Sequence, residues 1–253
     1  MRGLMGAAAA AIVFVGFAGS VTAAEGGYPK QNWSFDGVFG SFDRAALQRG
    51  FQVYQEVCAG CHGIKYIAFR NLTEIGLSED QVKAIAAEYE VEDGPDDEGE
   101  MFERPAILSD IIPLPFANDN AARASNNGAL PPDLSLMAKA RPGGPDYLHA
   151  LLIGYEDEPD DVTLNEGMSY NRYFSGNQIA MPPPLDDDAV EYSDGTAATV
   201  DQMSSDVVHF MMWAAEPKLE VRKRMGIKVM LFLLVLTALL YASKRKIWAR
   251  VDH

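Results

Sequence analysis

Apolar residues recur at helical spacing in the stretch that begins at Asp43. Leu47, Phe51, Tyr54 and Cys58 follow one another at steps of four, three and four residues, which places them on one face of a helix. The pattern predicts an amphipathic helix over 43–57. Its apolar face leads directly into the segment at Cys58.

A second helix is predicted over 78–89. Ser78 stands in an N-cap position, and the apolar residues Val82, Ile85 and Ala86 fall on one side of the helix. The sequence then runs into an acidic stretch.

Two more helices are predicted, a short one over 147–155 and a longer one over 200–215. The longer one is preceded by Thr199, with Gln202 at capping-box spacing. Its apolar residues share one face: Val200, Met203, Val207, Phe210, Met211 and Ala214. We therefore expect its methionines in the core, and we expect His209, which falls opposite this face, to be exposed.

Two nearly uncharged apolar runs lie toward the ends of the chain. Residues 226–243 contain Lys228 as their single charge, and at a helical rise of ~1.5 Å per residue they span roughly 27 Å, close to the hydrocarbon thickness of a bilayer. They predict a transmembrane helix, with a buried helix of a soluble protein as the alternative. Residues 1–24 have Arg2, an apolar core and small residues at their end, which is typical of a cleaved secretory signal peptide rather than a membrane anchor.

The predicted organisation is a signal peptide over 1–24, a periplasmic domain over 25–222, a membrane anchor over 223–243 and a tail over 244–253. Basic residues flank the anchor on both sides, so the positive-inside rule gives a near tie. The signal peptide decides the orientation, because it directs the residues that follow it across the membrane. We expect a single-pass protein of the bacterial inner membrane, with the 25–222 domain in the periplasm and the tail in the cytoplasm.

The other segments show no clear period. Residues 25–42 predict an arm packed on a neighbouring surface, and residues 104–147 predict ordered irregular chain that can wrap a flat apolar cofactor. Between Glu88 and Glu100, eight of thirteen residues are Asp or Glu. This acidic run is either a solvated loop without a specific partner or a docking patch that steers a basic redox protein, and electron-transfer rates insensitive to salt would exclude the second interpretation.

Length and charge narrow the classes of function. A chain of 253 residues accommodates one domain with accessories or two small domains. The formal net charge of -15 at pH 7 disfavours nucleic acid as a partner and favours basic proteins.

The two cysteines of the chain lie in Cys58-Ala59-Gly60-Cys61-His62. At this spacing two thiols bond covalently to a c-type haem and the histidine ligates its iron. A structural zinc site needs two more ligands at matching spacing, which the sequence lacks, and a thioredoxin-like pair lies in an α/β pattern rather than after a helix. We predict one covalently attached haem c, with a redox disulfide as the main alternative.

A haem iron held by His62 needs a second axial ligand if it is to carry electrons without binding small molecules. Met181 precedes three consecutive prolines, which exclude a helix and stiffen the chain, and we predict that its thioether is this ligand. The other candidates are His149, His209, His253 and the remaining methionines, among which Met101, Met137 and Met168 lack comparable local stiffness.

Four motifs occur together in the chain. They are Val57-Cys58-Ala59-Gly60-Cys61-His62, Ala122-Arg123-Ala124-Ser125-Asn126-Asn127-Gly128-Ala129-Leu130-Pro131-Pro132-Asp133-Leu134-Ser135, Ala180-Met181-Pro182-Pro183, and Trp213-Ala214-Ala215-Glu216-Pro217 followed by Arg222-Lys223-Arg224-Met225-Gly226. Together they resemble the cytochrome c1 family, the haem-bearing subunits of cytochrome bc1 complexes, in a bacterial form. The second and fourth motifs are much more specific than the haem motif.

The resemblance implies roles for individual residues. Cys58 and Cys61 would carry the haem, and His62 and Met181 would ligate its iron. Pro131 and Pro132 would lie near the porphyrin, and Arg141 and Tyr147 would contact its propionates, with Arg123 as an alternative. Some members of the family have an additional disulfide, which this chain lacks.

The resemblance also implies fold and function. The fold would be mostly α, like a class I cytochrome c with long irregular loops, plus one C-terminal transmembrane helix. The protein would pass single electrons from a Rieske iron–sulfur subunit to a soluble or membrane-tethered cytochrome c, beside cytochrome b, within quinol oxidation. It would not be an enzyme by itself and needs no catalytic residue.

Two other functions fit a covalently held haem. One is a haem peroxidase or gas sensor, which needs an open sixth position, and the stiff loop at Met181 argues against it. The other is a stand-alone membrane-anchored cytochrome c that shuttles electrons between other complexes.

Overall fold

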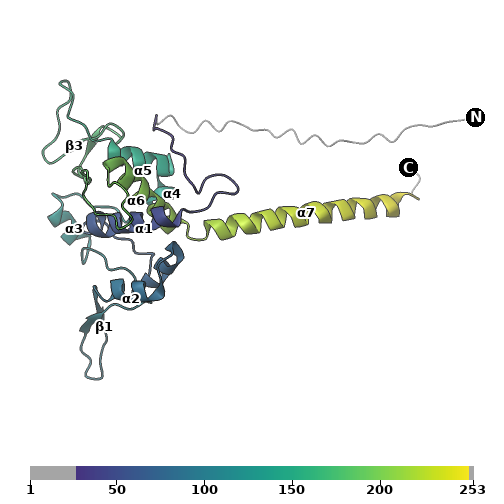
Figure 1. Cartoon of the computed structure of the whole chain (residues 1–253), viewed down its shortest axis with the longest axis horizontal. Coiled ribbons are helices and arrows are strands. Elements are labelled where there is room, and N and C mark those ends of the chain that lie inside the picture. The colour runs from purple at the N-terminus through teal and green to yellow at the C-terminus, as the bar shows by residue number, and fades with distance from the viewer. Residues whose placement is uncertain (1–26, 251–253) are drawn as a thin grey trace, which may run out of the picture.

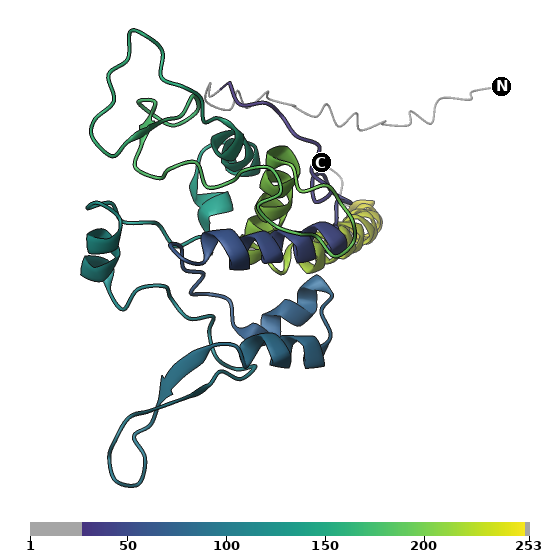
Figure 2. The same cartoon turned by 60° about the vertical axis from the view of Figure 1, so that its left-hand side comes forward.

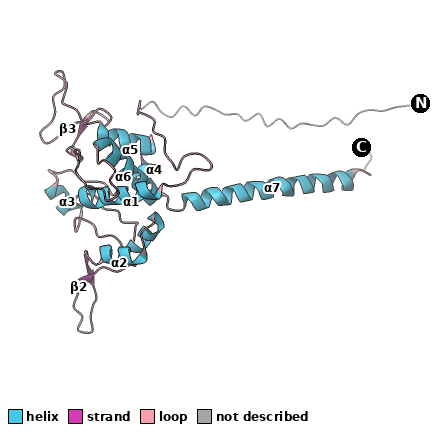
Figure 3. Ribbon diagram, viewed as in Figure 1, coloured by secondary structure: helices cyan, strands magenta, loops and turns pink. Residues whose placement is uncertain are grey.

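The computed structural model describes residues 27–250, so the signal peptide predicted over 1–24 lies outside the described residues. A head domain of helices and long loops carries one long helix that extends away from it (Figure 1). The helices are α1 (Arg44–Val53), α2 (Glu79–Ala86), α3 (Asp119–Ser125), α4 (Met137–Ala140), α5 (Gly144–Ile153), α6 (Val200–Ala215) and α7 (Leu219–Trp248), with a π-helical turn, η1 (Tyr54–Cys58), and a 3-10 helix, η2 (Phe69–Ile75). The strands are few and short (Figure 3).

The crossing of α1 and α6 forms the centre of the head domain. The helix predicted over 43–57 is confirmed: Asp43 accepts hydrogen bonds from the first backbone amides of α1, and the chain continues through η1 to Cys58. Gly50 lets the two helices meet, since a Cβ at this position would lie 2.0 Å from the backbone oxygen of Asp206. The rings of Phe51 and Phe210 pack beside this contact, with centroids 5.5 Å apart.

The predicted helix over 200–215 is also confirmed, with Thr199 accepting a hydrogen bond from the amide of Gln202. The expectation that His209 is exposed is wrong, because only 8% of its surface remains accessible. The N-terminal arm covers it: the rings of Trp33 and Phe35 meet the imidazole edge-on, with centroids 5.1 and 5.3 Å away. A second buried face appears on α6 because an irregular segment, which has no period of its own, packs against it.

The prediction of helix 78–89 holds for α2, where Ser78 and Gln81 form a reciprocal capping box. The acidic run that follows is not a simple loop. It forms half of an antiparallel hairpin, β1 (Glu90–Asp93) with β2 (Phe102–Pro105), which projects from the head domain (Figure 2). Both strands have only four residues, and Val91 is the one apolar residue of β1 that packs against the core, so the sequence shows no alternation of apolar and polar residues there.

The stretch 104–147 contains more helix than predicted. Asn118 caps α3 by accepting from the amide of Ala121, and α4 adds a single turn. These helices are too short to show a period, and α3 buries only Ala122. The helix predicted over 147–155 begins three residues earlier, at Gly144, and ends at Ile153.

Helix α7 contains the run predicted to cross a membrane. It is the one helix within residues 27–250 that is long and apolar enough to span a bilayer, and its apolar segment is exposed. Its first turn belongs to the head domain, where Glu220 accepts from the amide of Phe42 at 2.8 Å and pairs with Arg44 at 2.9 Å. The prediction of a mostly helical fold with one long apolar C-terminal helix is therefore confirmed, whereas the membrane anchor over 223–243 and the likeness to a class I cytochrome c stay predictions.

Candidate functional site

The Cys-x-x-Cys-His segment forms a tight turn at the end of η1. The carbonyl oxygen of Cys58 accepts hydrogen bonds from the amides of Cys61 at 3.1 Å and His62 at 2.9 Å. The buried hydroxyl of Tyr54 donates to the carbonyl of His62 at 3.2 Å. The turn is thus fixed to the core at both ends, with Cys58 partly buried and Cys61 exposed.

The thiol of Cys58 does not have the property of a reactive redox thiol. Both cysteines are free, and burial, followed by the nearby Cys61, raises the pKa of the Cys58 thiol to about 12. A reactive redox thiol instead needs a lowered pKa, because the thiolate is the attacking species, so Cys58 is not such a thiol.

The imidazole of His62 is oriented by the backbone of a distant segment. Its Nδ1 lies 2.8 Å from the carbonyl oxygen of Pro132. A carbonyl oxygen can only accept, so Nδ1 carries the proton and the lone pair of Nε2 is available to a metal. Burial lowers the pKa of His62, against the smaller opposing effects of Pro132 and Asp133, and so favours the neutral form that can ligate iron.

Residues 131–135 are held against the turn by several hydrogen bonds. The amide of Leu134 donates to the carbonyl of Gly63 at 2.8 Å, and the carboxylate of Asp133 accepts from the amides of Lys65 and Ser135. Little room separates the two segments, since a Cβ at Gly63 would lie 3.3 Å from this carboxylate. The structure therefore brings the carbonyl of Pro132 to His62, and the place of Pro131 and Pro132 near a porphyrin stays a prediction.

Exposed apolar side chains border this site. They lie in segments that follow the turn or are joined to residues 63–68 by hydrogen bonds and close contacts: Tyr66, Ile111, Leu114, Leu130 and Leu136, with between 37% and 60% of their surface accessible. Apolar side chains that stay exposed near a site can be covered by a ligand or a partner. Two free thiols, a histidine with its Nε2 available and an apolar rim fit a covalently bound haem.

The segment that carries Met181 is anchored to α5. The hydroxyl of Tyr155 donates to the carbonyl of Met181 at 3.1 Å. Just before it, β4 (Gln178–Ile179) pairs with β3 (Ser169–Tyr170), and the fully buried Asn171 ties this hairpin to the carbonyl of Leu151 at 2.8 Å. The stiffness predicted from the prolines thus has a second source in tertiary hydrogen bonds, and Met181 as an iron ligand stays a prediction.

The predicted propionate contacts occupy different places. Arg141 and Tyr147 are close enough that the charge of the guanidinium lowers the phenol pKa, although burial dominates and raises it overall. Arg123 instead donates to the carbonyl of Gly128 within its own loop at 3.0 Å. Arg123 thus has a local partner, and the propionate contacts of Arg141 and Tyr147 stay a prediction.

The other candidate ligands have partners or sites of their own. Met203 and Met211 are buried in the core, as predicted. His149 is buried and its Nε2 lies 3.2 Å from Asp201, and the Nδ1 of His209 lies 2.9 Å from the carbonyl of Ser205. His253 lies outside the described residues.

Sequence reasoning missed the groups that position the site rather than compose it. These are the hydroxyls of Tyr54 and Tyr155, the carbonyl of Pro132 and the carboxylate of Asp133. The only signal that could have found Asp133 was its place in the specific motif around residues 122–135. Backbone carbonyls leave no signal, because every residue has one.

Comparisons with known proteins agree with this geometry. The model of the "Cytochrome C1 family" matches residues 33–251. "Cytochrome c1" of Rhodospirillum rubrum is 53% identical over 96% of both chains. "Cytochrome c1 1, heme protein, mitochondrial" of Arabidopsis thaliana is 50% identical over 96% of this chain and 80% of its own. "Cytochrome b-c1 complex catalytic subunit, mitochondrial" of Candida albicans is 50% identical over 93% of this chain and 83% of its own.

Proposed function

The chain belongs to the cytochrome c1 family, and on that premise we propose that it is the haem-bearing electron-transfer subunit of a cytochrome bc1 complex. It accepts single electrons from a Rieske iron–sulfur subunit and passes them to a soluble or membrane-tethered cytochrome c. The observation that carries the proposal is the orientation of His62, whose Nδ1 is bound to the Pro132 carbonyl beside two free thiols.

The residues of the site have distinct roles in this proposal. Cys58 and Cys61 hold one haem c through thioether bonds, and His62 and Met181 are its axial ligands. The haem supplies a one-electron redox couple, which ligation by histidine and methionine places at a higher potential than ligation by two histidines. Pro131 and Pro132 lie near the porphyrin.

The remaining protein groups hold this arrangement rigid. Pro132 and Asp133 fix the histidine segment, and Tyr155 fixes the methionine segment. Arg141 and Tyr147 provide a positive charge and a hydroxyl for the propionates. No substrate bond is broken here, so the subunit needs neither a nucleophile nor a general base and is not an enzyme by itself.

Helix α7 anchors the domain in the membrane, as its exposed apolar surface supports. We place the haem domain in the periplasm of a bacterium and the tail after α7 in the cytoplasm. The signal-peptide pattern of residues 1–24 supports this orientation, because it directs the following chain across the membrane. Cytochrome b and the Rieske protein are the proposed partners in the membrane. Co-purification with both after mild detergent extraction supports the complex, and a solitary monomer supports the stand-alone alternative.

The test of the site compares Met181→Leu with Met168→Leu in the full-length holoprotein. Met168 is the matched control, because it is also half-buried and lies just before β3 in the same hairpin region. A redox-titrated optical spectrum is recorded for both variants and the wild type. We expect Met181→Leu to lower the midpoint potential markedly and to bind carbon monoxide, while Met168→Leu behaves as the wild type.

An unchanged spectrum and potential in Met181→Leu would show that another residue holds the iron. Rapid binding of cyanide or carbon monoxide by the wild type would favour the peroxidase or sensor alternative. Both results are independent of the partners, which the co-purification addresses.

A further inference from the structure

A turn of the N-terminal arm presents two apolar side chains to the outside, on the side of the head domain from which α7 leaves. Val38 is 64% exposed and Phe39 is 86% exposed. Phe35 and Phe42 on either side are buried in the core. The two phenylalanines thus pack in the core, whereas Val38 and Phe39 between them stay uncovered. Exposed apolar side chains of this kind mark a contact surface for another apolar environment, such as a membrane or a protein.

The backbone of this turn is held in one conformation. The amide of Asp36 donates to Trp33 and that of Ser41 donates to Ser34, each at 3.0 Å. Gly40 is required, since a Cβ there would lie 1.9 Å from the carbonyl oxygen of Asp36. The exposure of Val38 and Phe39 is thus built into the turn and does not come from a loose loop.

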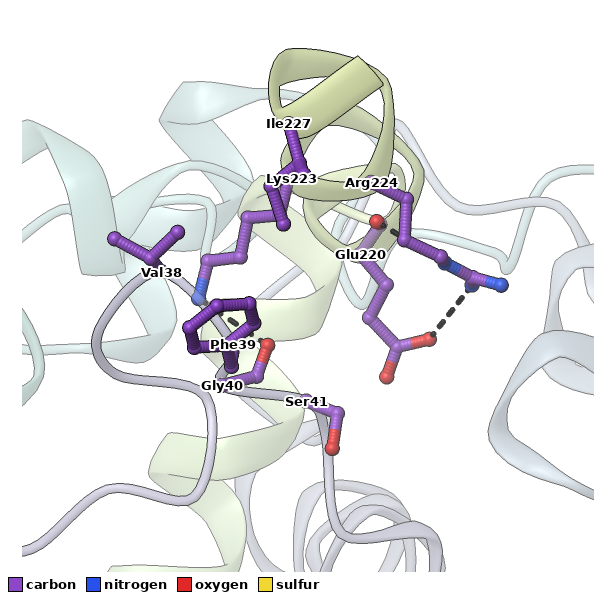
Figure 4. Close-up of a pocket in the computed structure, with 8 residues that line it drawn as sticks. All are labelled: Val38, Phe39, Gly40, Ser41, Glu220, Lys223, Arg224 and Ile227. Carbon is purple, nitrogen blue, oxygen red and sulfur yellow. Dashed lines mark hydrogen bonds and ion pairs between the residues drawn. The ribbon is translucent and has the colours of Figure 1, made fainter. Parts of the chain in front are cut away.

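The turn lies beside the first turns of α7. Figure 4 shows Lys223 reaching from the helix to the turn, where its ammonium group donates to the carbonyls of Phe35 at 2.5 Å and Gly40 at 3.2 Å. Val38 and Phe39 line one side of a shallow pocket, and Ile227 of α7 lines the other. In Figure 1 the arm, drawn in purple, forms a loop near the beginning of α7.

This contact sets the height of the turn relative to the membrane. Ile227 belongs to the apolar run 226–243 of α7, and it lies about 6 Å along the helix axis from Lys223. An apolar side chain at the level of Ile227 and outside the protein is therefore at the boundary between lipid head groups and acyl chains. This position therefore favours the lipid bilayer as the environment that covers Val38 and Phe39.

Charge at the same height favours lipid as well. The guanidinium of Arg224 is 70% exposed, and its nearest acidic partner, Glu220, is 3.6 Å away. Lys228 follows one helical turn later and is exposed. Cationic side chains at this level complement the phosphates of the head groups.

We propose that the turn of Val38 and Phe39 inserts into the membrane interface beside α7 as a second anchor point. One helix fixes the domain to the membrane but leaves it free to rotate and tilt. A second contact, rigidly joined to α7 through Lys223 and Glu220, restricts that tilt and holds the haem domain in one orientation to the bilayer. The proposal rests on the membrane anchor and not on the identity of the electron donor or acceptor.

The experiment places a photoreactive side chain in the full-length protein within its native membranes. Phe39→benzoylphenylalanine keeps an aromatic side chain at an exposed position, and the benzophenone inserts into nearby C–H bonds on irradiation. Phe102→benzoylphenylalanine is the matched control, because Phe102 is an exposed phenylalanine, 44% accessible, on the hairpin that projects from the head domain. Intact-mass analysis of the irradiated chain identifies the adducts.

We expect phospholipid adducts at position 39 with a yield several-fold above that at position 102. A cross-link from position 39 to another protein would overturn the proposal by showing that a subunit covers the turn. The absence of lipid adducts at position 39, or equal yields at both positions, would overturn it too. Each outcome can be read on a protein whose haem spectrum shows that it has folded.

Discussion

Replacing Gly50 by alanine tests whether the crossing of α1 and α6 supports the haem site. The added Cβ would lie 2.0 Å from the carbonyl oxygen and 2.6 Å from the carbonyl carbon of Asp206, and 2.9 Å from the Cβ of Phe210. The first two are backbone atoms in the middle of a helix, so no side-chain rotation relieves the contact. The helices have to separate.

The magnitude follows from two opposing effects. Carbon–oxygen contacts need roughly 3.4 Å, so the helices must move apart by more than ~1 Å, and overpacking of this kind costs about 1–3 kcal/mol or more. Separation also loosens the packing of Phe210 against Phe51 and Tyr54. Alanine would otherwise stabilise a helix by ~1 kcal/mol over glycine. With the overpacking cost at the upper end of its range, we expect Gly50→Ala to lower the free energy of unfolding by about 2 kcal/mol net.

The assay is urea unfolding of the full-length protein in detergent. Near-ultraviolet circular dichroism reports on the buried tryptophans of the head domain, Trp33 and Trp213, while α7 stays in the micelle. Gly60→Ala is the control, since a Cβ at Gly60 meets nothing within 4 Å. Its effect is expected within about 0.5 kcal/mol of zero. Because α1 continues through η1 into the cysteine turn, the yield of covalently attached haem should fall in Gly50→Ala as well.

A loss in Gly50→Ala that is no larger than in Gly60→Ala would refute this account. It would mean that the two helices adjust at little cost and that their crossing does not position the cysteine turn. A large loss of stability with a normal haem yield would separate the two claims, retaining the packing argument and rejecting the link to the site.

Two further predictions concern charged groups of the head domain. Asp206→Asn leaves the Arg49 guanidinium without its buried carboxylate partner at 2.8 Å and should lower the free energy of unfolding in urea by about 3–5 kcal/mol. Asp194→Asn removes the exposed partner of the same arginine and should lower this free energy much less. Equal losses in the two variants would contradict the argument. Arg104 lowers the pKa of Asp110, so this pair stabilises the β1–β2 hairpin above the unfolded-state pKa of about 4 and loses its effect as the pH falls through the lowered folded value. Amide exchange in the hairpin should therefore show protection that falls with acidification in the wild type and falls less in Asp110→Asn, where Asp93 still pairs with Arg104, and identical pH profiles would contradict this assignment.

Local patterns predicted the helices that bury one continuous face. The steps at Leu47, Phe51 and Tyr54 and the capping residues Ser78 and Thr199 mark helices that the structure contains at these places. They succeed because the apolar period and the cap hydrogen bonds lie within one helix and need no distant partner. The short helices α3 and α4 were missed, since they span too few residues to show a period.

The burial of His209 shows where a local pattern fails. Its position on α6 lies opposite the apolar face, yet Trp33 and Phe35 cover it from more than 170 residues away. The acidic run is a similar case, because its strand pairing with residues 102–105 depends on the chain returning past it. In each case the deciding contact comes from a segment with no period of its own.

The sequence by itself determined which chemical groups this protein offers to a cofactor and to a membrane. Two thiols and a histidine at fixed spacing, a methionine before three prolines and an apolar run near the end are covalent or local properties, and they were enough to indicate a membrane-anchored c-type cytochrome. Only the tertiary structure decided how these groups are held. The Pro132 carbonyl that frees Nε2 of His62, the Tyr155 hydroxyl at Met181 and the exposed turn beside α7 join residues distant in sequence. Such contacts depend on how the segments pack, and packing is a property of the whole chain.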